Sequence, residues 1–336
     1  MSEVRVVPFE PHHLDQTLAM MRRWSPDHPE LGERSLVDWQ RCRRYVALLG
    51  DKVVGQICQI AHEFRYGDER PPVNVGWGIT LVLDMSDDDT RKAAGRQLLK
   101  ACEEAPGLKY AAVGVVPTIE PAYIRRGHQL TREASSYYAR FFVPSKALAY
   151  WQKPRIAAPV LLAANAVLRP DTRVRFGTLE SITRFLPEWD PTWVHILRAR
   201  YGFFGARDAE YLNYKLRQPN RVYRTFLHRE RSGAIDGYLV LRRARHHVRD
   251  MDLVKICDFA GGDGALHDLF ATAIRFARTE AKGTYGIVAL SANVDGPALR
   301  AAGLWVARPY PIVVAAGVAV DRMRVSFFDS DLDDLW

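Results

Sequence analysis

Residues 73–99 read VNVGWGITLVLDMSDDDTRKAAGRQLL, and this stretch decides how the first half of the chain folds. Val73–Asp84 alternates and then becomes wholly apolar, as is typical of a strand buried in a sheet. Ser86 to Asp89 then supply an N-cap and an acidic first turn, and they predict a helix that runs to about Glu104. The sequence therefore predicts a central strand that meets a helix at a short polar turn.

The same arrangement recurs later in the chain. Asp252–Phe259 is predicted to be a strand, GGDG at 261–264 a turn, and Ala265–Ala281 a helix. A similar order of elements surrounds each turn, over residues 4–130 and again over 173–306. Each half has a strand, helices, paired strands, the strand-to-helix turn, another strand and a short helix that ends at a glycine. We therefore expect a duplicated α+β unit.

The expected boundaries follow from this repeat. An N-terminal domain covers 1–145, an apolar linker 146–172 and a C-terminal domain 173–336. Each domain is expected to hold a mixed, mostly antiparallel sheet flanked by helices. Tyr137–Val143 is predicted to be the last strand of the first domain. Trp305–Val314 and Met323–Phe328 are predicted to close the second.

The linker has an unusual composition, because Ile156–Leu168 is almost wholly apolar apart from Pro159. A bilayer needs about twenty apolar residues, so this run is too short to span one. A linker helix docked between the two domains is the first interpretation. A contact of residues 153–169 with a membrane surface, flanked by Lys153 and Arg155, is the second.

Composition narrows the functional classes. The chain has 336 residues, 48% hydrophobic residues and a net charge of +8. Two ordinary cores and an anionic partner such as a cofactor phosphate are expected. No nucleic-acid motif accompanies the charge. The four cysteines form no CxxC pair, and no signal peptide is visible, so we expect a cytoplasmic protein without a metal site.

The segment Thr90–Gly95 resembles the diphosphate-binding motif of the GNAT acyltransferase superfamily, and the whole chain resembles two GNAT units in tandem. The family pattern is Arg or Gln, two residues, Gly, one residue, then Gly or Ala; Gly95 is kept, whereas Ala93 and Thr90 depart from it. In the family, free amides at this helix start hold the diphosphate of an acyl-CoA. The resemblance implies acetyl-CoA or another acyl-CoA as cofactor. The residues implied to bind it are Arg91, Lys92, Ala93, Ala94, Gly95 and Arg96 in the first half and Gly261, Gly262 and Gly264 in the second.

A second segment, PAYIRRGH at 121–128, resembles the family's Tyr-x-x-x-Gly-Phe pattern. The resemblance implies that Tyr123 is the general acid that protonates the leaving thiolate. A phenol suits this role because it stays protonated at neutral pH. Leu299 stands at the corresponding place in the second half and cannot transfer a proton. Replacing Tyr123 by Phe is therefore expected to lower turnover by more than about tenfold with little change in acyl-CoA affinity.

The reaction also needs a base to deprotonate the acceptor amine. Asp84, which ends the central strand, and Glu63, which has His62 beside it, are the candidates in the first half. Asp258 has a similar place in the second. One half alone could bind the cofactor, or one half could have become a platform for the substrate. The first half is the expected place of the chemistry.

The acceptor is expected to be a small-molecule amine or an amino sugar. The aromatic and polar stretch Asp208–Tyr223 resembles a segment of GNAT-like proteins associated with bacterial polysaccharide assembly, and it could form a sugar-binding wall. One alternative is a Fem-type aminoacyl transferase, which would use aminoacyl-tRNA. Another is a degenerate tandem GNAT that binds without catalysis. The sequence does not predict the oligomeric state.

Overall fold

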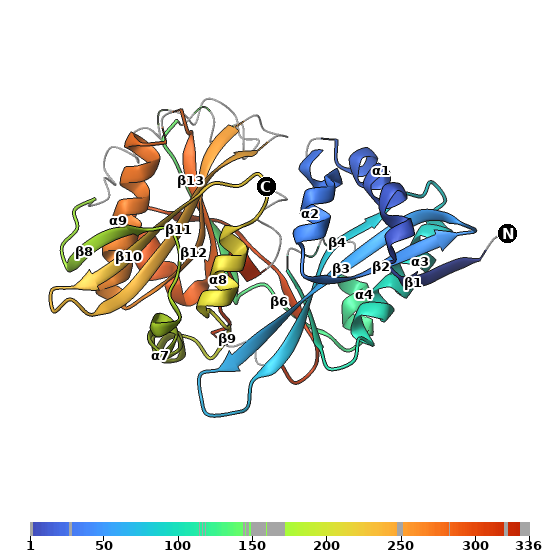
Figure 1. Cartoon of the computed structure of the whole chain (residues 1–336), viewed down its shortest axis with the longest axis horizontal. Coiled ribbons are helices and arrows are strands. Elements are labelled where there is room, and N and C mark those ends of the chain that lie inside the picture. The colour runs from blue at the N-terminus through green and yellow to red at the C-terminus, as the bar shows by residue number, and fades with distance from the viewer. Residues whose placement is uncertain are drawn as a thin grey trace.

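The molecule contains two β-sheets that lie side by side, each flanked by helices (Figure 1). The computed structural model describes residues 3–26, 29–113, 115, 117, 119–143, 145, 148, 159, 172–246, 251–281, 283–318 and 322–329. Both sheets are mixed and mostly antiparallel, with one parallel pair in each, β4 with β5 and β12 with β13. The predicted α+β fold class is confirmed. Most of the predicted linker, 146–172, lies outside the described residues.

The first sheet has the order β1-β2-β3-β4-β5-β15-β6, with β9 paired to β3. Its strands are β1 (Val4–Pro8), β2 (Cys42–Leu49), β3 (Lys52–Tyr66), β4 (Val73–Leu83), β5 (Lys109–Val113), β6 (Gln129–Thr131), β9 (Phe203–Gly205) and β15 (Ile312–Val314). Its helices are α1 (Leu14–Trp24), α2 (Arg34–Trp39), α3 (Asp88–Glu103) and α4 (Glu120–Arg125). One face packs on α3, and the other packs on α1 and α2.

The second sheet has the order β14-β7-β13-β12-β11-β10-β8. Its strands are β7 (Ser135–Phe141), β8 (Gly177–Ile182), β10 (Tyr223–Glu230), β11 (Ile235–His246), β12 (Met251–Gly261), β13 (Gly286–Ala292) and β14 (Trp305–Pro309). Its helices are α7 (Asp190–Arg200), α8 (Ala209–Leu216), α9 (Asp263–Thr279) and α10 (Gly296–Ala301). The apolar stripe of α9 packs on β11 and β12, as its helical spacing predicts.

The two sheets exchange a strand. β7, from the first half, lies between β13 and β14 of the second sheet, whereas β15, from the second half, lies between β5 and β6 of the first. Each sheet is thus completed by the other half of the sequence. The expectation that each half closes its own sheet is wrong, and the proposed domain boundaries at 145 and 173 describe the sequence repeat rather than two separate sheets.

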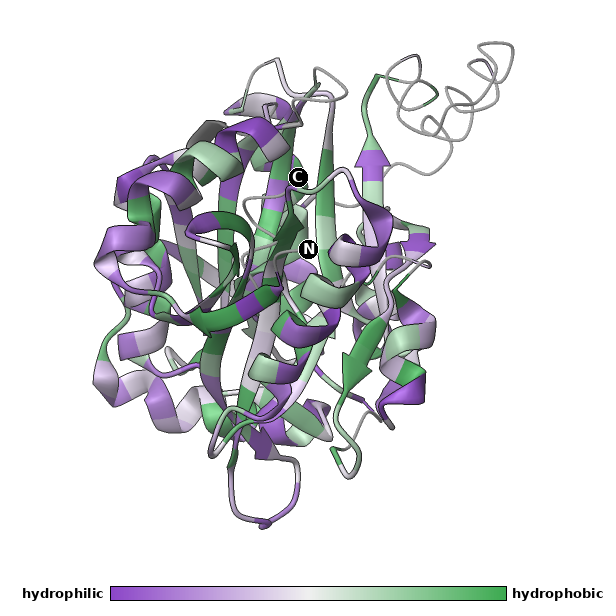
Figure 2. Cartoon of the chain, turned by 90° about the vertical axis from the view of Figure 1, so that its right-hand side faces the viewer, coloured by the Kyte–Doolittle hydropathy of each residue, from purple (hydrophilic) through white to green (hydrophobic). Residues whose placement is uncertain are grey.

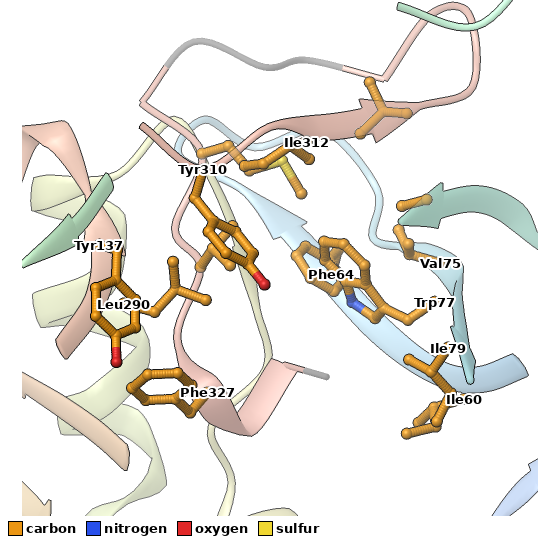
Figure 3. Packing of buried hydrophobic residues seen from close by; sticks show 14 of the residues in the cluster. Ile60, Phe64, Val75, Trp77, Ile79, Tyr137, Leu290, Tyr310, Ile312 and Phe327 are labelled. Atoms are coloured by element: carbon orange, nitrogen blue, oxygen red, sulfur yellow. The ribbon is translucent and has the colours of Figure 1, made fainter. Parts of the chain in front are cut away.

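A shared core fills the space between the sheets (Figure 3). Phe64 and Trp77 of the first sheet, Tyr137 and Leu290 of the second, and Phe327 near the C-terminus all belong to one buried cluster. Figure 2 shows hydrophobic residues concentrated along the interior strands and hydrophilic residues along much of the helices. The two halves therefore bury apolar surface against each other, which couples their stabilities.

Two further segments differ from the sequence-based expectation. The sequence of Ser181–Leu186 predicts a helical stretch, but Ser181 and Ile182 continue β8 because they pair with β10. Met323–Phe328, expected to be a strand, makes only an isolated bridge from Met323 to Phe203 and then enters a 3-10 helix, Phe327–Asp329. In both places tertiary contacts outweigh local propensity.

Candidate functional site

Each sheet opens where its parallel pair diverges. β4 pairs with β5 only from Val75 to Gly78, and β12 pairs with β13 only from Leu253 to Ile256. Just beyond this pairing each central strand carries an irregularity, with Thr80 at a φ of 52° in β4 and a register shift at Leu241 opposite β12. The structure therefore offers two related places for a ligand, each beside the helix that follows the central strand.

The start of α3, in the first half, is capped by a side chain of the protein and carries further acidic residues. The Thr90 amide donates to the Asp87 side chain at 2.7 Å, and hydrogen bonds with the Thr90 side chain and with this amide lower the pKa of Asp87. Asp88 and Asp89 add two further acids in the first turn. Three carboxylates at one helix start repel an incoming phosphate, and one of them already uses an amide that the phosphate would need.

The cofactor-binding motif inferred from the sequence lies inside α3 rather than before it. The Arg91 amide already donates to the Asp87 carbonyl at 3.0 Å, so the helix ladder has begun at this residue. Ala94 and Gly95 are buried against the sheet, and a Cβ on Gly95 would lie 3.2 Å from Leu83. Backbone amides from Ala93 to Arg96 therefore lie within the ladder, and only the Arg91, Lys92 and Arg96 side chains are placed to meet an anion.

The open face of the first sheet near Thr80 is also filled. Side chains from α1 and α2 cover it, and the cavity between them measures about 10 Å³, room for no more than one water molecule. Arg44 crosses this space and donates to Gln56 at 3.2 Å and to Gln40 at 2.8 Å. A pantetheine arm or acyl chain would have to displace these groups.

The start of α9, in the second half, is free of such a cap. Gly262 is the N-cap residue and offers no side-chain bond, and a Cβ added there would meet nothing within 4 Å. The Leu266 amide begins the ladder by donating to the Gly262 carbonyl. The amides of Asp263, Gly264 and Ala265 therefore precede the ladder and form the type of helix start that binds anions. Gly261 itself pairs with Gly237 in the sheet.

A cavity of about 480 Å³ lies against this helix start. It runs between α9 and α10, and small residues of α10 form one wall. The lining residues are Arg200, Asp263, His267, Val294, Pro297, Ala298, Ala301 and Ala302. A cavity of this size falls in the range of small-molecule and cofactor sites.

Tyr123, the acid inferred from the sequence, is buried beneath α3. Its hydroxyl bonds the Tyr110 hydroxyl at 2.8 Å, and only 4% of the residue is exposed. Burial raises the pKa of Tyr123 to about 12, although the bond to Tyr110 opposes this. The side chain belongs to the core of the first unit, and its role as general acid stays a prediction.

Asp84 and Glu63 lie far apart. Asp84 follows β4 and pairs with Arg23 at 2.6 Å, whereas Glu63, on β3, pairs with Arg65 at 2.7 Å. The Asp84 amide bonds the carbonyl of Val54, nine residues before Glu63 on the same strand, so about 30 Å separates the two positions. The structure therefore does not bring these carboxylates together, nor either one with Tyr123.

Asp258 is the centre of a buried charge cluster. It accepts from Arg207 at 2.9 Å, from Arg324 at 2.6 Å and from Tyr238 at 2.7 Å. Burial alone would raise its pKa, but the two arginines lower the pKa of Asp258 to about 2. A carboxylate held this firmly in its charged form is a weak base at neutral pH.

Solved structures with the same architecture give this geometry a context. No protein-family model matches the sequence, and no curated protein matches it. A GCN5-related N-acetyltransferase from Anabaena variabilis superposes with a TM-score of 0.62 at 11% identity, over 92% of this chain and 72% of that one. A probable N-acyltransferase from Enterococcus faecalis gives 0.60 at 13%, over 92% and 71%. Saccharomyces cerevisiae N-myristoyltransferase with bound myristoyl-CoA gives 0.57 at 11%, over 94% and 82%.

The chain has a tandem GNAT fold. At this level of identity the likeness fixes the architecture, and the sequence-based resemblance to two GNAT units is confirmed. The two strand-to-helix turns are at equivalent positions of the two GNAT units. At this position α3 has a side-chain cap, whereas α9 has none.

The GNAT units meet at α8, the helix within the predicted sugar-binding stretch. Tyr214 stacks on Trp39 of α2 with ring centroids 4.7 Å apart, and the Tyr211 ring lies 4.0 Å from that of His62. These aromatic rings pack at the junction of the halves.

In the described part of the chain, no group of His, Cys, Asp and Glu is arranged to hold a metal. No described helix is long and apolar enough to cross a membrane.

Sequence reasoning missed Arg200 and His267, which line the cavity beside α9. Arg200 ends α7, and nothing in its local sequence marks it as a neighbour of Asp263. His267 could have been found, because it lies one turn into the helix that follows GGDG. The absence of a capping side chain at Gly262 was also visible in the sequence, and it is the more useful signal.

Proposed function

We propose that this protein is an acyl-CoA-dependent N-acyltransferase, and that its second GNAT unit holds the cofactor. The uncapped start of α9, which opens on a cavity of about 480 Å³, carries this proposal. Amides that precede the helix ladder and the positive end of the helix dipole favour a diphosphate there. The cavity between α9 and α10 has room for the part of the cofactor next to the diphosphate.

The reaction we propose is direct transfer of an acetyl or other short acyl group to the amine of a small molecule or an amino sugar. The amine attacks the thioester carbonyl, the carbon–sulfur bond breaks, and the coenzyme leaves as the thiol once it has received a proton. Positioning and backbone amides would supply most of the rate enhancement. A role in polysaccharide assembly rests only on the resemblance of the Asp208–Tyr223 stretch.

One observation favours a second candidate, a binding protein that no longer catalyses. Leu299 stands where the first half has Tyr123 and is fully buried, and Asp258 is held as a carboxylate by two arginines. In the described part of the second unit, neither residue can take the acid or base role. Thioester cleavage in the presence of a panel of amines separates the two candidates, because only an acyltransferase releases free coenzyme A when an amine is added.

A reciprocal pair of variants tests the cofactor site. Gly262→Asp places in α9 the cap that α3 already has, so the new carboxylate occupies an amide and repels phosphate. We expect coenzyme A affinity, measured by calorimetry, to fall by about tenfold or more, while the helix gains a cap and the melting temperature does not drop.

Asp87→Gly is the matched control in the first unit. It removes the corresponding cap from α3, and we expect coenzyme A affinity to stay unchanged, with a loss of only a few tenths of a kcal/mol in stability. Unchanged binding in Gly262→Asp together with altered binding in Asp87→Gly would place the cofactor in the first unit instead. No detectable coenzyme A binding by the unmodified protein would end the proposal.

A further inference from the structure

Arg200 bridges the two helix starts that flank the cavity. Its Nε donates to Asp295, which precedes α10, at 2.6 Å, and its Nη1 donates to Asp263, the first residue of α9, at 2.8 Å. One guanidinium therefore lies across the mouth of the gap between α9 and α10. This is the gap into which the free amides of α9 open.

The two carboxylates that Arg200 binds differ in environment. The Asp295 side chain is fully buried and also accepts from Tyr201 at 2.9 Å and from Ser291 at 2.6 Å. The Asp263 side chain is 91% exposed. The bond to Asp295 therefore fixes the guanidinium in place, whereas an ion pair with so exposed a carboxylate contributes little and is readily exchanged.

The GGDG turn lacks the basic residue that usually leads a diphosphate-binding motif, and Asp263 adds a negative charge. Arg200 supplies a cation at this position from another helix. A guanidinium binds phosphate oxygens through two parallel hydrogen bonds and prefers the more highly charged of two competing anions. A diphosphate at the start of α9 would therefore compete with Asp263 for the Nη edge of Arg200.

We propose that Arg200 is a diphosphate-binding residue of this site and that Asp263 is an internal competitor, which holds the guanidinium until the phosphate displaces it. This inference rests on the proposed function, since it assigns the anion at that site. It also makes the site selective for ligands with a diphosphate, such as coenzyme A and ADP, over the pantetheine arm alone.

Asp263→Asn tests the inference by a gain of affinity. The variant removes a like charge from the site and frees the Nη edge of Arg200, and the exposed position should tolerate the change. We expect affinity for coenzyme A and for ADP, measured by calorimetry, to rise about three- to tenfold, and pantetheine binding to stay the same. Arg200→Lys, which keeps the charge and loses the two-pronged geometry, should weaken coenzyme A binding about tenfold.

Asp88→Asn is the matched control, because Asp88 is also an exposed first-turn acid paired with an arginine, Arg91 of α3. Its affinity for coenzyme A should equal that of the unmodified protein. If the unmodified protein binds coenzyme A and Asp263→Asn binds no more tightly, the competition is disproved while the proposed function stands. A gain in Asp88→Asn alone would assign the diphosphate to α3 and overturn the inference, and absence of binding by every variant would remove both proposals.

Discussion

At the scale of single residues, the buried side chain of His62 shows how its surroundings at the junction of the two halves set a protonation state. His62 lies within the core of this junction and faces the guanidinium of Arg207 at 3.2 Å, and the tilted ring of Tyr211 lies 4.0 Å from its own ring. Burial and the charge of Arg207 hold the pKa of His62 well below 6.5, and Lys215 acts in the same direction. His62 is therefore neutral, and its Nε2 accepts a hydrogen bond from Arg207.

This state makes stability depend on pH. Unfolding releases His62 to its ordinary pKa, so below about pH 6.5 the unfolded chain binds a proton that the folded chain does not. Stability should therefore fall as the pH drops from about 6.5 to 5, by at most about 1.4 kcal/mol per pH unit from this residue. His62→Gln keeps an acceptor for Arg207 without a titrating group.

Urea unfolding of both proteins at several pH values checks this prediction. The His62→Gln variant should show the shallower loss of stability between about pH 6.5 and 5. Equal slopes in the two proteins would mean that His62 is protonated in the folded state, contrary to its environment.

The hydroxyl of Tyr123 is the second residue-scale test. If the second unit holds the cofactor, Tyr123→Phe and Tyr110→Phe remove the same buried hydrogen bond, and each should cost about 1 kcal/mol of stability. Turnover per folded molecule should change less than about twofold in both. Rate measurements on the matched pair would reinstate Tyr123 as the acid if it alone lost more than about tenfold.

The limit of sequence reasoning at this scale is shown by Asp87. The sequence identified an N-cap and a diphosphate-binding motif within a few residues of each other, yet both cannot use the same amides. The structure resolves the competition in favour of the cap. Arg200 could not be found at all, because its contact with Asp263 depends on where the fold places the end of α7 relative to the start of α9.

At the scale of elements, hydrophobic periodicity predicted most helices and strands near their observed positions. It could not assign partners to strands. Every residue of β7 is buried, so its pattern suits the interior of either sheet. β15 has only three residues, all buried, and the predicted strand Trp305–Val314 runs through Pro309 and Pro311, which lie at the break between it and β14. Hydrophobic periodicity indicates which residues are buried but not which strands pair, so it cannot predict the strand exchange.

The exchange predicts how the chain behaves when it is cut. A single cleavage placed within 146–172 should leave the two fragments associated, since β7 and β15 still cross between them. We expect co-elution on gel filtration in native buffer and separation only in denaturant. Each fragment expressed alone should be poorly folded, because one lacks β15 and the other lacks β7. Two fragments that fold separately and elute apart would contradict the topology.

At the scale of the whole molecule, two GNAT units of one architecture differ in the state of one helix start. In the first unit, carboxylates occupy the turn before α3, and Arg44 with its partners occupies the open face of the sheet near Thr80. The second has kept free amides and a cavity. We infer a division of labour in which the second unit holds the cofactor and the first supports the shared core. The sequence predicted the duplication, but it favoured the other unit for chemistry.

A crystal structure of the protein with coenzyme A tests this division most directly. We expect density for the diphosphate at the amides of Asp263, Gly264 and Ala265, with the adjoining part of the molecule between α9 and α10. Density at the start of α3, or a second unit left empty at saturating coenzyme A, would contradict it.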